Sequence, residues 1–237
     1  MVCEVRKSIQ VGKYLAASAA VALLWAAPSY AQQIEEVVVT AERHAENQQE
    51  VPLSVATLDD EAINAIYESG QDIKAIAVHI PDVYAESSNG RVAPRFYIRG
   101  LGNTDFDLAA SQPVSIIMDD VVMENTILKS APIYDQADVE VSRGPQGTLF
   151  GRNTTAGVIK FASKKPTQDF DAFVTGSYGE LGTANVDAAV GGGLTDTLSV
   201  RVSGEWVHRD NYIDNLYTHQ NGALGGYDEG AARVQLL

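Results

Sequence analysis

The sequence predicts an α+β domain followed by antiparallel β-strands long enough to cross a membrane. Residues 51–165 mix short helical and extended patterns, whereas residues 166–237 alternate apolar and polar side chains. An apolar segment near the start of the chain has the features of an export signal. We therefore expect four regions, at residues 1–31, 32–50, 51–165 and 166–237.

Residues 1–31 have the pattern of a secretory signal peptide. Basic residues open the segment, an apolar stretch runs from Tyr14 to Ala27, and small residues precede the expected cleavage after Ala31. The stretch is about fourteen residues long, shorter than the roughly twenty that a membrane-spanning helix requires. We expect export and cleavage, with a retained anchor as the alternative. The single cysteine, Cys3, lies in this leader, so the exported chain is expected to lack disulfides.

The composition argues against several classes of function. The 17 Lys+Arg and 31 Asp+Glu give a formal net charge of −14 at pH 7, which disfavours binding to nucleic acid or to an anionic lipid surface. The four histidines are dispersed and form no metal-binding or catalytic motif: His44, His79, His208 and His219. We expect neither a catalytic site nor a metal site, and therefore no enzyme.

Two short helices are expected early in the α+β region. In LDDEAINAIYESG, Asp59 or Asp60 is the expected N-cap and Gly70 the stop. In QDIKAIAVHIP, Asp72 is the expected cap and Pro81 ends the helix. Each helix has one apolar face, made by Ile63, Ile66 and Tyr67 in the first and by Ile73, Ile76 and Ala77 in the second.

Extended segments follow the helices. They are RFYIRG, VSIIMDDVVM, ADVEVSRG and GVIKFASKKP. The second is expected to form a hairpin at Asp119-Asp120. A two-residue type I′ turn needs positive φ at both positions, which Gly adopts more easily than Asp, so we expect a longer turn or another type.

The alternation after Pro166 predicts membrane strands. The runs 170–178, 183–194 and 198–209 are about nine to twelve residues long, which suits a tilted strand crossing a bilayer. A fourth run begins in ARVQLL, after a long connection at 210–230. The alternative is a soluble antiparallel sheet with one wet face, which produces the same alternation.

A long motif identifies the family. VEVSRGPQGTLFGRNTTAGVIKFASKKP, at residues 139–166, closely resembles the end of the plug domain of TonB-dependent outer-membrane receptors. FYIRG at 96–100 looks like the earlier plug motif, and VVVTAER at 37–43 resembles a TonB box. The order of leader, box, plug and first strands also matches, so the resemblance covers essentially the whole chain.

The resemblance implies a signal peptide at 1–31, a TonB box and linker at 32–50, a plug domain at 51–165, and the start of a 22-stranded barrel at 166–237. Because such a barrel needs several hundred residues, we expect the chain to be an N-terminal fragment. Only Gln32 and Gln33 precede the box after cleavage, so no signalling domain is expected there.

The function implied is active uptake of a scarce solute across the outer membrane: an iron-siderophore, haem, cobalamin or an oligosaccharide. The implied partners are TonB with ExbB and ExbD, outer-membrane lipid and the transported ligand. No cofactor is expected beyond a metal carried by the solute. The alternatives are a passive barrel and a ligand-binding plug-like module without TonB coupling.

The resemblance assigns TonB binding to the box. Its residues are Ile34, Glu35, Glu36, Val37, Val38, Val39 and Thr40. We expect this strand to have no partner within its own chain and to be loose at rest. TonB would then bind it by adding it to a sheet, a mode in which main-chain hydrogen bonds carry the affinity.

The second set of site residues belongs to the plug motifs and to plug–barrel contacts: Arg99, Gly100, Arg143, Gly144, Pro145, Gly147, Gly151, Arg152, Asn153 and Gly157. The glycines are expected to serve backbone shape. The resemblance implies that Arg99 and Arg143 pair with barrel carboxylates beyond Leu237, with local surface ion pairs as the alternative. The chain departs from the family pattern at Lys160, where Asn is common.

Overall fold

The computed structural model describes residues 38–40, 44, 46–105, 107 and 110–237. The chain separates into two units, Met1–Glu36 and Val37–Leu237, and every described residue belongs to the second. The expected leader and the box residues 34–37 lie outside the described residues.

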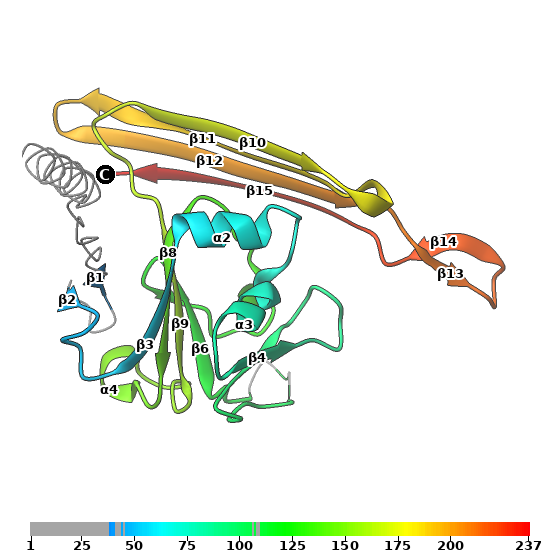
Figure 1. Ribbon diagram of the computed structural model, residues 1–237, viewed down its shortest axis with the longest axis horizontal. Coiled ribbons are helices and arrows are strands. Elements are labelled where there is room, and N and C mark those ends of the chain that lie inside the picture. The colour runs from blue at the N-terminus through cyan, green and yellow to red at the C-terminus, as the bar shows by residue number, and fades with distance from the viewer. Residues whose placement is uncertain (1–37, 41–43, 45, 106, 108–109) are drawn as a thin grey trace, which may run out of the picture. The chain divides into compact units, whose positions relative to one another are not determined.

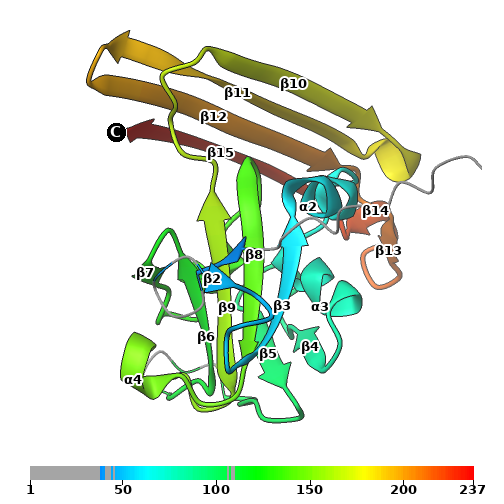
Figure 2. The same ribbon diagram turned by 60° about the vertical axis from the view of Figure 1, so that its left-hand side comes forward.

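A five-stranded sheet forms the centre of the α+β domain (Figures 1 and 2). Its order is β3 (Ser54–Asp59), β8 (Gln136–Arg143), β9 (Gly157–Ser163), β6 (Val114–Met118) and β7 (Val121–Val122). The pair β6–β9 is parallel and the other neighbours are antiparallel. The expected extended segments are confirmed, but β3 was not predicted.

Three short helices cover one face of this sheet: α2 (Asp60–Tyr67), η1 (Ile73–Ala75) and α3 (Ile76–His79). The predicted caps are confirmed, because the carboxylate of Asp59 accepts a hydrogen bond from the Ala62 amide and that of Asp72 accepts one from the Lys74 amide. Within the described ranges, no helix has the length and hydropathy to cross a bilayer.

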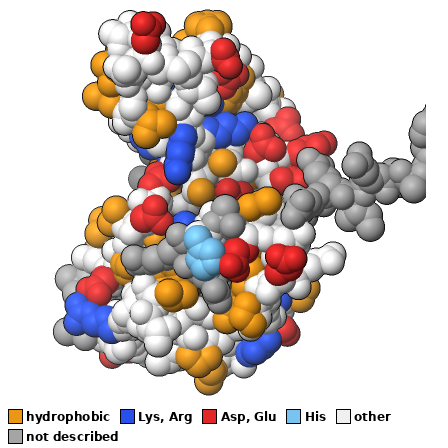
Figure 3. All heavy atoms as spheres, turned by 90° about the vertical axis from the view of Figure 1, so that its left-hand side faces the viewer, with side chains coloured by type: hydrophobic (Ala, Val, Ile, Leu, Met, Phe, Trp, Pro, Cys, Tyr) orange, Lys and Arg blue, Asp and Glu red, His pale blue; other side chains and the backbone are white. Residues whose placement is uncertain are grey.

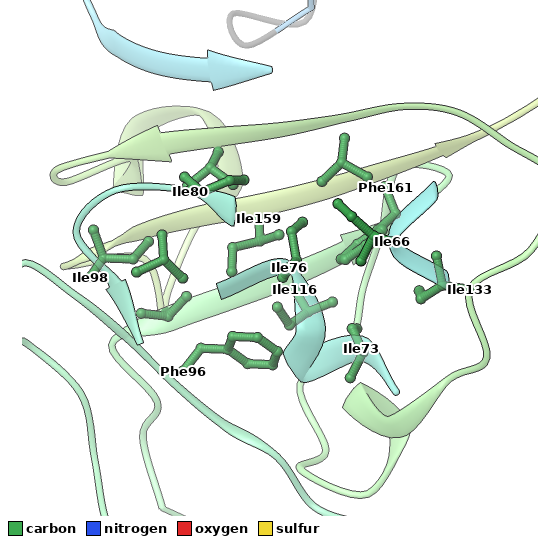
Figure 4. Close-up of a cluster of buried hydrophobic side chains, with 14 of the residues drawn as sticks. Ile66, Ile73, Ile76, Ile80, Phe96, Ile98, Ile116, Ile133, Ile159 and Phe161 are labelled. Atoms are coloured by element: carbon green, nitrogen blue, oxygen red, sulfur yellow. The ribbon is translucent and has the colours of Figure 1, made fainter. Parts of the chain in front are cut away.

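The hydrophobic core lies between these helices and the sheet (Figure 4). Ile76 from α3 and Ile116, Ile159 and Phe161 from the sheet are completely buried. The predicted helix faces are confirmed: Ile63, Ile66, Tyr67, Ile73 and Ile76 are buried and Ala77 is partly buried. Burying large apolar side chains contributes about 1.5–3 kcal/mol each, so this face holds the domain together.

Smaller elements complete the domain. β4 (Val83–Glu86) and β5 (Arg95–Ile98) form a separate antiparallel pair, which the sequence predicted only in its second strand. Two single turns lie after the β6–β7 hairpin: η2 (Leu128–Ser130) and, within the long motif, α4 (Gly147–Phe150).

The β6–β7 hairpin turns in two residues. Asp119 has φ 47° and Asp120 has φ 67°, so both occupy the positive-φ region that a type I′ turn requires. The expectation of a longer or different turn was wrong. The Asp119 carboxylate accepts hydrogen bonds from the amide and hydroxyl of Ser163, which stabilises aspartate in this conformation.

A four-stranded antiparallel sheet follows the domain. Its strands are β10 (Asp171–Tyr178), β11 (Ala184–Thr195), β12 (Leu198–Arg209) and β15 (Tyr227–Leu236), in that order. The β10–β11 connection contains η3 (Glu180–Gly182), and the long connection contains a hairpin of β13 (Ile213–Asn215) and β14 (Gln220–Leu224) that the sequence did not predict.

The polarity of this sheet is opposite to that of a soluble protein. Apolar side chains are exposed: Val190 is 47% and Trp206 is 44% exposed. The polar side chains of Asn185, Ser199 and Arg201 are only 3–5% exposed. A soluble sheet with one wet face would bury the apolar side and expose the polar one. The pattern is the one expected for strands with lipid outside and a polar interior.

One lysine of the α+β domain is buried without a carboxylate. Lys129 is 2% exposed, and its ammonium donates a hydrogen bond to the Val114 carbonyl at 3.0 Å. No described carboxylate pairs with it. Burial lowers the pKa of Lys129 to about 8, because the interior solvates the charged form poorly.

Replacing Lys129 with methionine should stabilise the protein at pH 7. The lysine is protonated there in both the folded and the unfolded chain, so the folded state carries the cost of a buried charge. We expect Lys129→Met to raise the free energy of unfolding by about 1–2 kcal/mol, after the lost Val114 hydrogen bond is subtracted. Chemical denaturation measures this difference.

The pH dependence provides an internal check. With lysine at 129, stability should rise with pH from about 8 to 10.5, because the unfolded chain then holds a proton that the folded chain has lost. The methionine variant should lack this component of the rise, and a Lys165→Met control on the surface should retain it. A methionine variant less stable than the parent at pH 7 would contradict the account.

Candidate functional site

The described end of the box is a strand with a partner in its own chain. β1 (Val38–Val39) pairs antiparallel with β2 (Glu46–Asn47). Val39 is completely buried, whereas Val38 is 56% exposed. The prediction that the box has no partner in its own chain is therefore wrong for these residues. The unpaired edge of a short strand binds a nearby edge, and residues 46–47 provide one.

Thr40 fixes the end of this strand to the central sheet. Its amide donates a hydrogen bond to the Glu140 carboxylate at 2.5 Å, and its hydroxyl donates to the same oxygen at 3.1 Å. The Lys160 ammonium donates to that hydroxyl at 2.9 Å. Glu140 on β8 and Lys160 on β9 are directly opposite each other in the ladder. The expectation of a box loose at rest is therefore wrong at Thr40.

Strand alternation explains why these charges lie together. Val141 on β8 and Ile159 on β9 point into the core, so Glu140 and Lys160 lie on the opposite face of the sheet. Glu140 is 3% and Lys160 is 9% exposed. The Lys160 ammonium also forms an ion pair with the Asp120 carboxylate, at 3.3 Å.

Asp138 lies two residues before Glu140 on the same face. Burial and the neighbouring Glu140 carboxylate raise the pKa of Asp138 to about 6. One oxygen of Asp138 and one of Glu140 are buried without a hydrogen-bond partner in the described part of the chain. This face of the sheet therefore holds two partly unsatisfied carboxylates close to Lys160.

A cleft of about 750 Å³ with several charged side chains in its lining adjoins Thr40. Asp138 and Lys160 from the α+β domain line it, together with Asp171 and Arg201 from the following strands. Figure 3 shows acidic and basic side chains close together on this side of the molecule. The residues that hold the box thus border the space between the domain and the strands.

The glycines of the long motif adopt conformations that other residues avoid. Gly144 has φ 110°, Gly151 has φ 76° and Gly157 has φ 153°. A Cβ on Gly157 would lie 2.3 Å from the carbonyl oxygen of Ser142. In the earlier motif Gly100 has φ 77°. These glycines provide backbone shape rather than chemical groups.

The remaining residues of the long motif form local contacts. Gly147 begins α4 and Pro145 is exposed in the preceding turn. Arg152 makes a two-pronged ion pair with Glu124, at 2.8 and 2.5 Å, on the exposed surface, where such pairs contribute little to stability. Asn153 has φ 65°, and its side-chain oxygen accepts hydrogen bonds from Ser111 and Gln112.

Arg99 and Arg143, the two arginines expected to contact the barrel, pair with no described carboxylate. Arg143 donates to the Pro81 carbonyl and to the Ser54 hydroxyl, both at 3.2 Å. Arg99 is exposed and has φ 52°. The alternative of local surface ion pairs thus finds no support within the described residues, and pairing with carboxylates beyond Leu237 stays a prediction.

A deeply buried ionic contact joins the domain to the strands, but here the domain provides the carboxylate and the strands provide the arginine. Asp135, just before β8, accepts hydrogen bonds from Arg201 on β12 at 2.8 and 2.6 Å. The two side chains are 1% and 3% exposed. Arg201 also binds Asp171 at 2.8 Å, and Arg233 on β15 donates to the Asp135 carbonyl at 3.0 Å. We call these four residues the Asp135 cluster.

The sequence motifs did not reveal the Asp135 cluster, because its members are up to 98 residues apart along the chain. One signal was present: Arg201 is a charged residue at an inward-facing position of a membrane strand, where such residues are buried only with partners. A second ionic contact joins the α+β domain to the four-stranded sheet, which we call the wall. In it Arg91 binds Glu229 on β15 at 2.8 Å and the Gly70 carbonyl at 3.0 Å.

Comparison with known proteins gives one consistent result. Residues 47–158 match the TonB-dependent Receptor Plug Domain family. The chain is 28% identical over 211 residues to the iron-regulated outer membrane virulence protein of Vibrio cholerae, covering 81% of the chain and 31% of that protein. It is 30% identical over 141 residues to the catecholate siderophore receptor Fiu of Escherichia coli, covering 56% of the chain and 17% of the receptor.

A solved structure agrees in fold. The ferric yersiniabactin uptake receptor FyuA from Yersinia pestis superposes with a TM-score of 0.68 at 20% identity, covering 78% of the chain and 28% of FyuA. The chain therefore spans less than a third of the length of these relatives. The matched plug residues fall inside the expected region 51–165 except at the first four positions.

The conformation of Gly157 yields a stability test. A side chain there meets the Ser142 carbonyl and requires an unfavourable φ, so we expect Gly157→Ala to lower the free energy of unfolding by about 2 kcal/mol or more. Gly147→Ala is the matched control, because its Cβ would have no neighbour closer than 3.9 Å and alanine favours the helix. Equal effects of the two substitutions in urea denaturation would contradict this assignment.

Proposed function

We propose that this chain, whose residues 47–158 match the TonB-dependent receptor plug domain, forms part of a transporter that imports a scarce solute across the outer membrane. In this proposal TonB binds the box and supplies the energy. The strands β10, β11, β12 and β15 begin the surrounding barrel and lie in outer-membrane lipid.

The observation that carries the proposal is the position of Thr40. A box that delivers force must be connected to the domain that blocks the pore. Thr40 meets this requirement through its hydrogen bonds to Glu140 and Lys160, on two central strands of the plug sheet. The exposed edge residue Val38 is where an incoming strand would begin to pair.

We propose a ferric siderophore as the solute. Two relatives support this proposal. The one matched over 211 residues is named as iron-regulated, and the one matched over 141 residues is named as a catecholate siderophore receptor. Haem, cobalamin and oligosaccharides are the other solutes considered. The proposal includes ExbB and ExbD as the partners that energise TonB, and it includes no catalytic step and no cofactor of the receptor itself.

Proline at position 38 tests the role of the box. Proline removes a backbone donor and disfavours pairing of the strand with TonB. We expect Val38→Pro in the full-length receptor to abolish uptake of iron from catecholate, hydroxamate or phenolate siderophores, whichever the receptor imports. Binding of the same siderophore to whole cells should stay within about twofold, because affinity for the solute does not require the box.

Val38→Ile is the matched control, because it preserves the strand, and should import normally. A host without TonB should reproduce the proline phenotype with the unsubstituted receptor. Equal uptake with and without TonB would contradict the proposal and would favour a passive barrel.

A further inference from the structure

The plug sheet has a charged face as well as an apolar one. Its apolar face packs against the helices, and part of the other face packs around Ile117, Phe150 and Val158 near α4. Between that patch and the edge of the domain lie Glu140 and Lys160, which are nearly as buried as core residues. Their described side-chain partners include Thr40 of the box.

We propose that Glu140 and Lys160 are positioning residues that hold Thr40 and thereby set how readily the box leaves the plug to bind TonB. We call the contacts of Thr40 with Glu140 and Lys160 the latch. This inference rests on the proposed function, because it names residues that regulate the box. It gives a role to Lys160, the position at which the chain departs from the family pattern.

The contacts of the latch depend on both the backbone and the side chain of Thr40. The Glu140 oxygen receives both the amide and the hydroxyl of Thr40, and the hydroxyl in turn accepts from Lys160. The hydroxyl thus acts as a donor and as an acceptor at once, with one charged group on each side. Hydrogen bonds to charged groups are stronger than those between neutral groups.

The latch competes with TonB for the same backbone. Strand addition needs the free main-chain groups of the box, yet the Thr40 amide is bonded to Glu140 and Val38–Val39 are paired with β2. The Thr40 amide can pair with TonB only after its hydrogen bond to Glu140 opens. The free energy that holds the latch closed is therefore subtracted from the affinity for TonB.

This competition fixes the sign of the expected effect. A substitution that weakens the latch should increase exposure of the box and tighten TonB binding. A substitution that destabilises the plug elsewhere is not expected to tighten TonB binding. Glu140→Gln removes the charge but keeps an acceptor oxygen. Thr40→Val removes both hydroxyl hydrogen bonds and leaves the amide in place, with little change in side-chain volume.

The first measurement is exposure of the box in the absence of TonB. The full-length receptor carrying Val39→Cys is purified in detergent and treated with a maleimide. Because Val39 is completely buried, the thiol should react only when the box opens. We expect Glu140→Gln, Thr40→Val and Lys160→Gln, each in this background, to react roughly tenfold faster.

Glu124→Gln is the matched control. It makes the same chemical change to a carboxylate that is paired with Arg152 on the surface and does not contact the box. Its reaction rate should equal that of the parent. The three latch variants remove different contacts of Thr40. If one variant fails to fold, the other two still test the latch.

The second measurement is binding of the periplasmic domain of TonB to the same receptors without the cysteine. Latch variants should bind several-fold more tightly than the parent and the Glu124→Gln control. Unchanged thiol reactivity in the latch variants overturns the latch, whatever TonB does. Faster thiol reaction with no TonB binding in any receptor supports the latch and contradicts the proposed function.

Discussion

The contact between Asp135 and Arg201 is the interaction on which the arrangement of plug and strands depends. A carboxylate of the plug and a guanidinium of the wall are almost completely removed from water and bonded through two pairs of atoms. Breaking a buried pair from one side leaves an uncompensated charge and costs about 3–5 kcal/mol. Arg201 on the inner face of β12 therefore needs Asp135 of the plug to compensate its buried charge, and Asp135 needs Arg201 for the same reason.

Strand β8 connects this wall contact to the box. Asp135 immediately precedes the strand, Glu140 lies within it and Arg143 ends it. Its inward residues Val139 and Val141 bind the strand to the helices through the core. One strand thus contacts the β12 side chain Arg201 just before its start, Thr40 in its middle and the helices along its other face.

Local features of the fold could be predicted from the sequence, because they depend on neighbours along the chain. Asp59 and Asp72 cap helices, and the alternation after Pro166 gives strands with an exposed apolar face, as expected. Contacts between distant segments could not be predicted. The pairing of Val38–Val39 with β2 and the Asp135 cluster depend on where the chain folds back. The Asp119-Asp120 turn was missed because its stabilising partner, Ser163, is distant in sequence.

A double-mutant cycle between Asp135 and Arg201 tests the central claim most directly. The free energy of unfolding of the plug within the full-length receptor would be measured for Asp135→Asn, Arg201→Gln and the double variant. We expect a coupling energy of about 3 kcal/mol, because each partner shields the other's buried charge. A parallel cycle between the exposed Glu124 and Arg152 should show no measurable coupling. Additive effects at Asp135 and Arg201 would contradict the account.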